Sequence, residues 1–198
     1  MFLLWLLLFF VLFQIGIRVW FRVSPQAIPF GWTWLLENPW RKWYRQPESI
    51  ASRCEIKPSD TVLELGCGSG LFTPFLAAAA KNLIAQDVEA RYVAQAQAKN
   101  PQVTFLVSDA RALALPDQSV DVAVLISVLP EIRQPVEALK ECWRVLKTGG
   151  RLVISQELFE PEYVTASTTD TWARQAGFVL VRHSGNAWVY FRHYQKNT

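Results

Sequence analysis

The sequence predicts an α/β fold, in which a doubly wound, mostly parallel seven-stranded sheet closes with an antiparallel C-terminal hairpin and follows one transmembrane helix. Three observations support this prediction. Short apolar runs alternate with amphipathic stretches from residue 61 onward, a glycine-rich turn follows the first of these runs, and a nearly uninterrupted apolar run opens the chain.

The opening run contains one strongly polar side chain in its first 17 residues, Gln14, and Arg18 ends it. Because about 20 helical residues cross a hydrocarbon layer about 30 Å thick, we expect residues 1–23 to form a transmembrane anchor. Two alternatives stay open. A cleaved signal peptide is disfavoured because no Lys or Arg precedes the run and bulky residues follow it. A buried core helix is disfavoured because the run has no polar face.

Positive charge gathers on the C-terminal side of this run, at positions 18, 22, 41, 42 and 45. The positive-inside rule therefore predicts a single-pass membrane protein whose remaining chain lies in the cytoplasm. Six of the nine tryptophans fall within the first 43 residues, among three prolines at positions 25, 29 and 39. Because Trp favours the headgroup level, we expect residues 24–57 to form an interfacial collar and lid, although these tryptophans could instead cap the domain core.

The net charge is only +3, and the three cysteines are scattered along the chain. The broad basic field of nucleic-acid-binding proteins is absent, and no Cys or His residues stand at metal-ligand spacing. We therefore predict neither a nucleic-acid partner nor a metal site. The cysteine usage fits a reducing compartment.

Residues 58–198 are expected to form one domain, because strand–helix alternation with short connections indicates a parallel sheet covered by helices. Apolar runs predict strands at residues 61–65, 82–87, 103–108, 120–126 and 151–155. Helical periodicity or Ala-rich composition predicts helices at 71–81, 89–99, 169–176 and from 135 to the glycine pair at 149–150. A turn signal at 184–186 joins two last strands at 178–183 and 187–193, which predicts the hairpin.

The pattern E-x-G-x-G-x-G occupies residues 64–70, where the first strand ends and a helix begins. Glycines let the backbone approach a ligand closely, and in an open α/β sheet ligands bind beyond the carboxyl ends of the strands. A dinucleotide fingerprint G-x-G-x-x-G fails because Leu71 stands at its third glycine position. An NAD-dependent oxidoreductase on a similar fold is therefore a disfavoured alternative.

The same pattern closely resembles motif I of class I S-adenosylmethionine-dependent methyltransferases, which have a Rossmann-like fold. The resemblance extends over roughly residues 60–155. An acidic residue, Asp87, ends the second strand, and another, Asp109, follows the third. Residues 115–122 and 143–152 match the family's approaches to its fourth and fifth strands. The likeness is closest to small-molecule methyltransferases, which include quinone-biosynthesis enzymes.

This resemblance implies an enzyme with S-adenosylmethionine as its cofactor. It implies that Asp87 binds the ribose hydroxyls and that Asp109 contacts the adenine amino group. The implied cofactor-binding residues are Glu64, Gly66, Cys67, Gly68, Gly70, Asp87, Val88, Asp109, Ala110 and Ser127. Structural alternatives stay open, because Glu64 could be a satisfied strand-end carboxylate, Asp87 could cap the next helix and Asp109 could form a turn.

The acceptor is expected near residues 127–132, after the fourth strand. Family members often carry a His or an aromatic residue there, whereas this chain has Pro130 and Glu131, so no catalytic residue is assigned and Glu131 is a weak candidate for a base. Residues 34–52 would roof the pocket and touch the membrane. We therefore expect a small, lipophilic acceptor, such as a quinone precursor, a lipid or an apolar thiol. A non-catalytic, membrane-tethered scaffold that binds the cofactor is the other alternative.

Overall fold

The computed structural model describes residues 46–158, 160, 162–186 and 188–196, together with residues 4–6, 8, 9, 12, 15, 16 and 19. Most of the predicted anchor, residues 1–23, and the larger part of the predicted collar, residues 24–57, lie outside the described residues. Across the described ranges, no helix is both long enough and apolar enough to cross a bilayer.

The predicted alternation of strands and helices is confirmed. The strands are β1 (Thr61–Leu65), β2 (Asn82–Asp87), β3 (Thr104–Val107), β4 (Val120–Ile126), β5 (Leu146–Glu157), β6 (Phe178–Gly185) and β7 (Val189–Lys196). The helices are α4 (Pro47–Ser52), α5 (Thr73–Ala79), α6 (Ala90–Lys99), α7 (Pro135–Val145) and α8 (Ala166–Gln175), with a short 3₁₀ helix, η2, at Leu129–Glu131.

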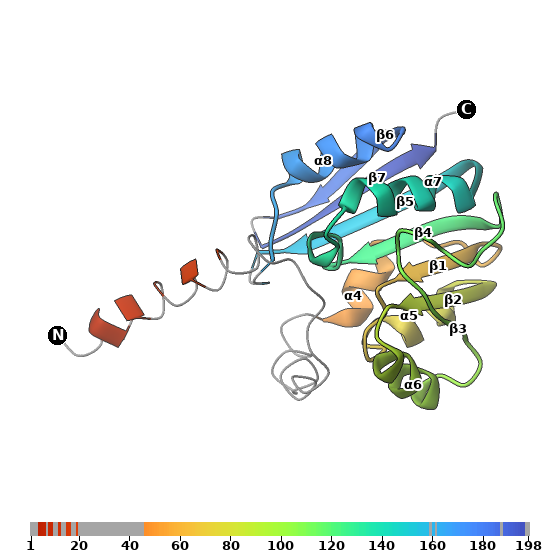
Figure 1. Cartoon of the computed structure of the whole chain (residues 1–198), viewed down its shortest axis with the longest axis horizontal. Coiled ribbons are helices and arrows are strands. Elements are labelled where there is room, and N and C mark those ends of the chain that lie inside the picture. The colour runs from red at the N-terminus through yellow and green to blue at the C-terminus, as the bar shows by residue number, and fades with distance from the viewer. Residues whose placement is uncertain are drawn as a thin grey trace.

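The seven strands form one sheet in the order β3-β2-β1-β4-β5-β7-β6 (Figure 1). Strands β1 to β5 pair in parallel, and β7 runs antiparallel to both of its neighbours. The Rossmann-like sheet with an antiparallel C-terminal hairpin is therefore confirmed. The last strand lies inside the sheet, and β6 forms the edge. Burial explains this order, because β7 buries four of its eight residues, including Phe191 and Tyr194, whereas β6 buries only Phe178.

Helices cover both faces of the sheet, with α7 and α8 on one face and α4, α5 and α6 on the other (Figure 1). The two faces draw on alternate residues of each strand, because successive side chains of a strand point to opposite sides. In β1, Leu63 and Leu65 pack with α7 and α8, whereas Val62 packs with α4 and α5. Helix α4 joins this second face through Ile50 and Ala51, which are both buried.

Several predicted boundaries are shifted, and the largest error lies between α7 and β5. Helix α7 ends at Val145, several residues before the glycine pair at 149–150, and β5 already begins at Leu146. Leu146 is fully buried, pairs with Val120 and accepts a hydrogen bond from Nζ of Lys196 (2.6 Å). The glycine pair therefore lies within an irregular start of β5, where the pairing register with β4 shifts.

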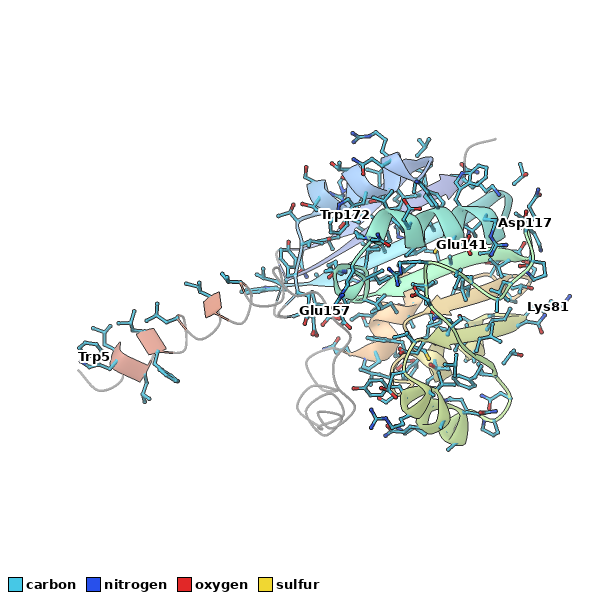
Figure 2. The ribbon with its side chains drawn as sticks, in the orientation of Figure 1. Trp5, Lys81, Asp117, Glu141, Glu157 and Trp172 are labelled. Atoms are coloured by element: carbon cyan, nitrogen blue, oxygen red, sulfur yellow. The ribbon has the colours of Figure 1, made fainter. Side chains whose placement is uncertain are left out.

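The two ends of the sheet differ in what they carry. Figure 2 shows Lys81 and Asp117 at the end where β2 and β4 begin, and Glu157 at the opposite end. The strand order reverses between β1 and β4, since β2 and β3 lie on one side of this pair and β5 on the other. In a doubly wound sheet, a ligand site is expected at the carboxyl ends of such a pair.

Candidate functional site

The glycine-rich turn begins against the end of β2. The amides of Gly66 and Cys67 both donate to the carbonyl of Gln86, at 2.8 and 2.9 Å. Gly66 has a φ of +74°, and a Cβ at this position would overlap Cγ2 of Val128 in the loop after β4. Only glycine fits here, because the backbone conformation and the close contact both exclude a side chain.

The middle of the turn, at Gly68, leaves room for a ligand. Its φ is +52°, and no atom of the residues that the structure describes lies within 4 Å of the position that a Cβ would take. Its amide donates to Oδ2 of Asp87 (2.8 Å), so the carboxylate that ends β2 holds the backbone of the turn.

Asp87 is buried, with 8% of its surface exposed. Its second oxygen, Oδ1, accepts from the amide of Glu89 (3.0 Å), the residue that precedes α6. Burial raises the pKa of the Asp87 carboxyl, and the backbone amides of Glu89, Gly68 and Val88 oppose this shift. A carboxylate has about four acceptor sites, so about two remain for the hydroxyls of a ligand.

Glu64 lies beneath the turn. It is 4% exposed, and Oε2 accepts from Oγ1 of Thr73 (2.7 Å), the first residue of α5. Burial raises the pKa of Glu64 to about 8, against the lowering effect of the Thr73 hydroxyl, and the charge of Asp87 adds to the rise. The hydrogen bond from Thr73 favours the alternative that Glu64 is a satisfied strand-end carboxylate. The predicted contact of Glu64 with the cofactor stays a prediction.

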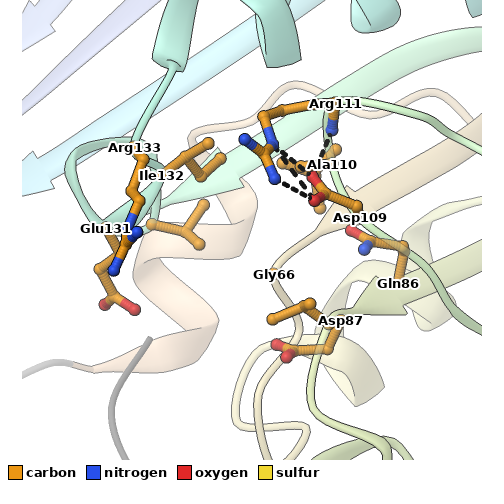
Figure 3. A pocket seen from close by; sticks show the side chains of 12 residues that line it. Gly66, Gln86, Asp87, Asp109, Ala110, Arg111, Glu131, Ile132 and Arg133 are labelled. Atoms are coloured by element: carbon orange, nitrogen blue, oxygen red, sulfur yellow. Dashed lines mark hydrogen bonds and ion pairs between the residues drawn. The ribbon is translucent and has the colours of Figure 1, made fainter. Parts of the chain in front are cut away.

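A cavity of about 300 Å³ opens at the carboxyl ends of β1 to β4 (Figure 3). Five predicted cofactor residues line it: Gly66, Asp87, Val88, Asp109 and Ala110. The other five lie outside the lining: Glu64, Cys67, Gly68, Gly70 and Ser127. Glu131, the candidate base, belongs to the wall. Val128 and Ile132, from the predicted acceptor loop at residues 127–132, also line it. The lining residues that were not predicted are Leu65, Gln86, Arg111 and Arg133.

A signal for some of these missed residues was available in the sequence. Leu65 and Gln86 precede predicted residues directly, and in a parallel sheet the last residues of neighbouring strands meet at one edge. Gln86 is 2% exposed, and its Nε2 donates to the carbonyl of Ser108. Its Oε1 is buried and has no hydrogen-bond partner within the described part of the chain.

The loop after β4 carries Ser127, which has an unusual φ of +54°. Its amide donates to the carbonyl of Ser155 (2.9 Å), while its hydroxyl is buried without a partner among the described residues. Its predicted contact with the cofactor stays a prediction.

Cys67 is 6% exposed, and burial raises the pKa of its thiol. A protonated, buried thiol is a poor nucleophile, so the backbone of Cys67 is the part available to a ligand.

Asp109 is engaged differently from Asp87. Nη2 of Arg111 lies 2.6 Å from Oδ2 of Asp109, and Nε lies 2.9 Å from Oδ1 (Figure 3). These bonds lower the pKa of Asp109 to about 2, so the carboxylate is ionised.

The lining fits a nucleoside that carries a charged tail. Asp87 offers acceptors for a pair of hydroxyls, and the side chains of Val88 and Ile132 offer apolar surface for a base. The open space beside Gly68 leaves the turn accessible to the rest of the ligand. Both carboxylate oxygens of Asp109 accept hydrogen bonds from the side chain of Arg111.

Comparison with known proteins agrees with this geometry. Residues 63–154 match the family model described as a methyltransferase domain. The chain is 34% identical over 121 residues to a probable S-adenosylmethionine-dependent methyltransferase of Mycobacterium tuberculosis, a match that covers 61% of this chain and 43% of that protein. It is 30% identical over 116 residues to a demethylmenaquinone methyltransferase of Paenarthrobacter aurescens, covering 59% of this chain and 45% of that protein. The chain thus spans less than half the length of these two relatives.

A solved structure also matches the fold. A SAM dependent methyltransferase from Aquifex aeolicus superposes with a TM-score of 0.78 at 23% identity, covering 86% of this chain and all of that one. These matches are to methyltransferases and therefore argue against the alternative of an NAD-dependent oxidoreductase. Residues 63–154 form a methyltransferase domain of the S-adenosylmethionine-dependent family, whose cofactor is S-adenosylmethionine.

Proposed function

We propose that this protein transfers a methyl group from S-adenosylmethionine to a small, lipophilic acceptor at a membrane surface. One observation carries the proposal: the carboxylate of Asp87 lines the cavity at the switch point between β1 and β4 and also holds the amide of Gly68 in the glycine-rich turn. This is the edge of the sheet at which doubly wound folds bind nucleotides.

The cofactor supplies a methyl group bonded to a positively charged sulfur, which is already activated for in-line displacement. The residues of the chain have to hold the acceptor atom in line and keep water out. The apolar side chains of Leu65, Val128 and Ile132 form part of the wall that would do this. A base is needed only where the acceptor must lose a proton early. Glu131 is the carboxylate of the wall on the acceptor side and is the candidate for that role.

Two observations support a lipophilic acceptor that enters from a bilayer. Five apolar side chains lie in the wall of the cavity, and one relative of the chain is named a demethylmenaquinone methyltransferase. The apolar segment at residues 1–23 would tether the domain to the membrane, with the catalytic domain on the cytoplasmic side, where the following Arg and Lys residues favour it.

Asp87→Ala is expected to weaken the binding of S-adenosylhomocysteine, the demethylated cofactor, by about 100-fold. The substitution removes two hydrogen bonds from a charged acceptor, each contributing about 1.5 kcal/mol. Isothermal titration calorimetry with the full chain measures this loss. Because Asp87 also holds the amide of Gly68, thermal unfolding should be recorded alongside and should show the native fold.

Asp121→Ala is the matched control. Asp121 lies on β4, where it accepts from the amide of Thr61 (2.9 Å) and pairs with Lys147 (2.8 Å), outside the cavity lining. This variant should lose stability but keep its affinity for the cofactor. Equal binding by Asp87→Ala and the parent protein would contradict the proposed site. Binding without turnover of any acceptor in membranes would support a scaffold role.

The membrane proposal predicts that the full chain stays with the membrane fraction during an alkaline carbonate wash. Leu8→Arg combined with Leu12→Arg should release it, because each arginine at the centre of a membrane helix costs about 3 kcal/mol. A matched control with both positions changed to Phe should remain in the pellet. Recovery of the parent chain in the soluble fraction would refute the anchor while leaving the methyl-transfer proposal standing.

A further inference from the structure

Arg111 donates hydrogen bonds to both carboxylate oxygens of Asp109. Oδ1 accepts from the amide and from Nε of Arg111, at 2.8 and 2.9 Å. Oδ2 accepts from Nε and from Nη2 of the same residue, at 3.1 and 2.6 Å. Nε has a single hydrogen that the two oxygens share, so Arg111 places three donor hydrogens on a carboxylate that offers about four lone-pair sites. The amino group of a base has to compete with these donors for Asp109.

The guanidinium also reaches across the cavity wall. Nη1 of Arg111 donates to Oε1 of Gln134 (2.9 Å), which precedes α7. Arg111 therefore connects the loop after β3 to the end of the loop between β4 and α7. The two side chains of the ion pair are each 40% exposed, so the bridge lies at the mouth of the cavity (Figure 3).

The loop after β3 does not depend on this bridge for its position. The amide of Leu113 donates to Oε2 of Glu141 (2.8 Å), and Arg144 donates to the carbonyls of Leu113 and Leu115, at 3.0 and 2.8 Å. Arg111 can therefore leave Asp109 while α7 continues to hold the loop.

We propose that Arg111 determines how strongly the cofactor binds and how well its base is recognised, because its guanidinium competes with the adenine amino group for Asp109. Cofactor binding breaks the ion pair between Asp109 and Arg111 and the hydrogen bond from Arg111 to Gln134. The loop after β4 thereby loses one of its contacts. This inference rests on the proposed function, because it requires the adenine to lie beside Asp109.

The competition has a measurable size. An exposed ion pair with bidentate geometry contributes roughly a factor of three to ten to an equilibrium, and salt screens it. Removing the competitor should therefore improve binding by that factor at low ionic strength. If Arg111 only supported the local fold, its removal would weaken cofactor binding instead.

The experiment titrates S-adenosylhomocysteine into the full chain and into Arg111→Met, at about 50 mM and about 500 mM salt. We expect Arg111→Met to bind about three- to ten-fold tighter at the lower salt. The affinity of the parent chain should rise towards that of the variant as salt increases. Lys140→Met is the matched control, because it removes the same charge from another exposed pair, with Glu137 (2.9 Å), outside the cavity lining. Its affinity should equal that of the parent chain.

S-inosylhomocysteine, in which a carbonyl replaces the adenine amino group, tests the atom involved. The gain from Arg111→Met should vanish with this ligand, because it has no amino group to donate to Asp109. The preference for the adenosyl over the inosyl ligand should therefore increase in the variant. Arg111→Lys, which cannot form the bidentate pair, should give an intermediate gain and serves if Arg111→Met fails to fold.

Equal or weaker binding of S-adenosylhomocysteine by both Arg111 variants, with the parent chain binding normally, would overturn the inference. A gain of the same size with the inosyl ligand would also overturn it. Absence of binding in the parent chain would instead contradict the proposed function, so the two failures can be told apart.

Discussion

Gly66→Ala is expected to lower the free energy of unfolding by about 2–5 kcal/mol and to abolish measurable cofactor binding. The left-handed backbone conformation at φ +74° costs an alanine about 1–2 kcal/mol. The overlap of the new Cβ with Val128 forces the turn and the loop after β4 apart, which adds about 1–3 kcal/mol. Urea denaturation and calorimetry with S-adenosylhomocysteine measure the two effects.

Two further variants separate these causes. Gly68 has a similar φ of +52°, but within the described part of the chain a Cβ there would meet no atom within 4 Å. Gly68→Ala should therefore lose only the backbone contribution of about 1–2 kcal/mol. Val128→Ala removes the two methyl groups that the new side chain would strike, so the double variant with Gly66→Ala should recover part of the stability. Equal losses for Gly66→Ala and Gly68→Ala would show that the contact with Val128 is unimportant.

Glu64→Gln is expected to stabilise the ligand-free protein at about pH 8 and to change it little at about pH 5. Burial raises the pKa of Glu64 from 4.5 to about 8 in the folded chain. A carboxyl with a raised pKa contributes stability that is complete below its unfolded pKa and is lost as pH rises through its folded pKa. The parent protein should therefore weaken between about pH 4.5 and pH 8, whereas the neutral glutamine is insensitive to pH.

The full effect of that pKa difference is about 5 kcal/mol, and relaxation around the buried charge reduces the expected gain at pH 8 to about 2–3 kcal/mol. Urea denaturation of both proteins across this pH range provides the measurement. Thr73→Val should steepen the pH dependence of the parent chain, because it removes the hydroxyl that stabilises the ionised form of Glu64. Parallel pH profiles for Glu64→Gln and the parent chain would rule out a raised pKa at this position.

The central strands were the most predictable part of the fold. β1, β2 and β4 begin and end at the residues that their apolar runs indicate, because a strand buried on both faces needs a continuous apolar run. The end of α7 was not predictable from the glycine pair at 149–150. Leu146 fits a helical period, but its pairing with Val120 and its burial favour the strand.

The candidate site divides in the same way. Asp87 and Asp109 were identified from motifs, and the structure brings both to one cavity. Glu64 was also identified from a motif, but it accepts a hydrogen bond from Thr73, nine residues further along the chain. This contact could not be read from the motif. Arg111 carries no motif of its own, and its importance becomes visible only from its contacts with Asp109 and Gln134.

The sequence by itself determined the alternation of strands and helices, the glycine turn, and the carboxylates that end β2 and follow β3. These features depend on side-chain periodicity and on local backbone preferences, which neighbouring residues encode. Only the tertiary structure decided that β7 lies between β5 and β6, that Val128 packs against Gly66, and that Arg111 covers Asp109 at the cavity mouth. The first two depend on contacts between segments far apart in the chain, and the third on the side-chain conformation that those contacts select.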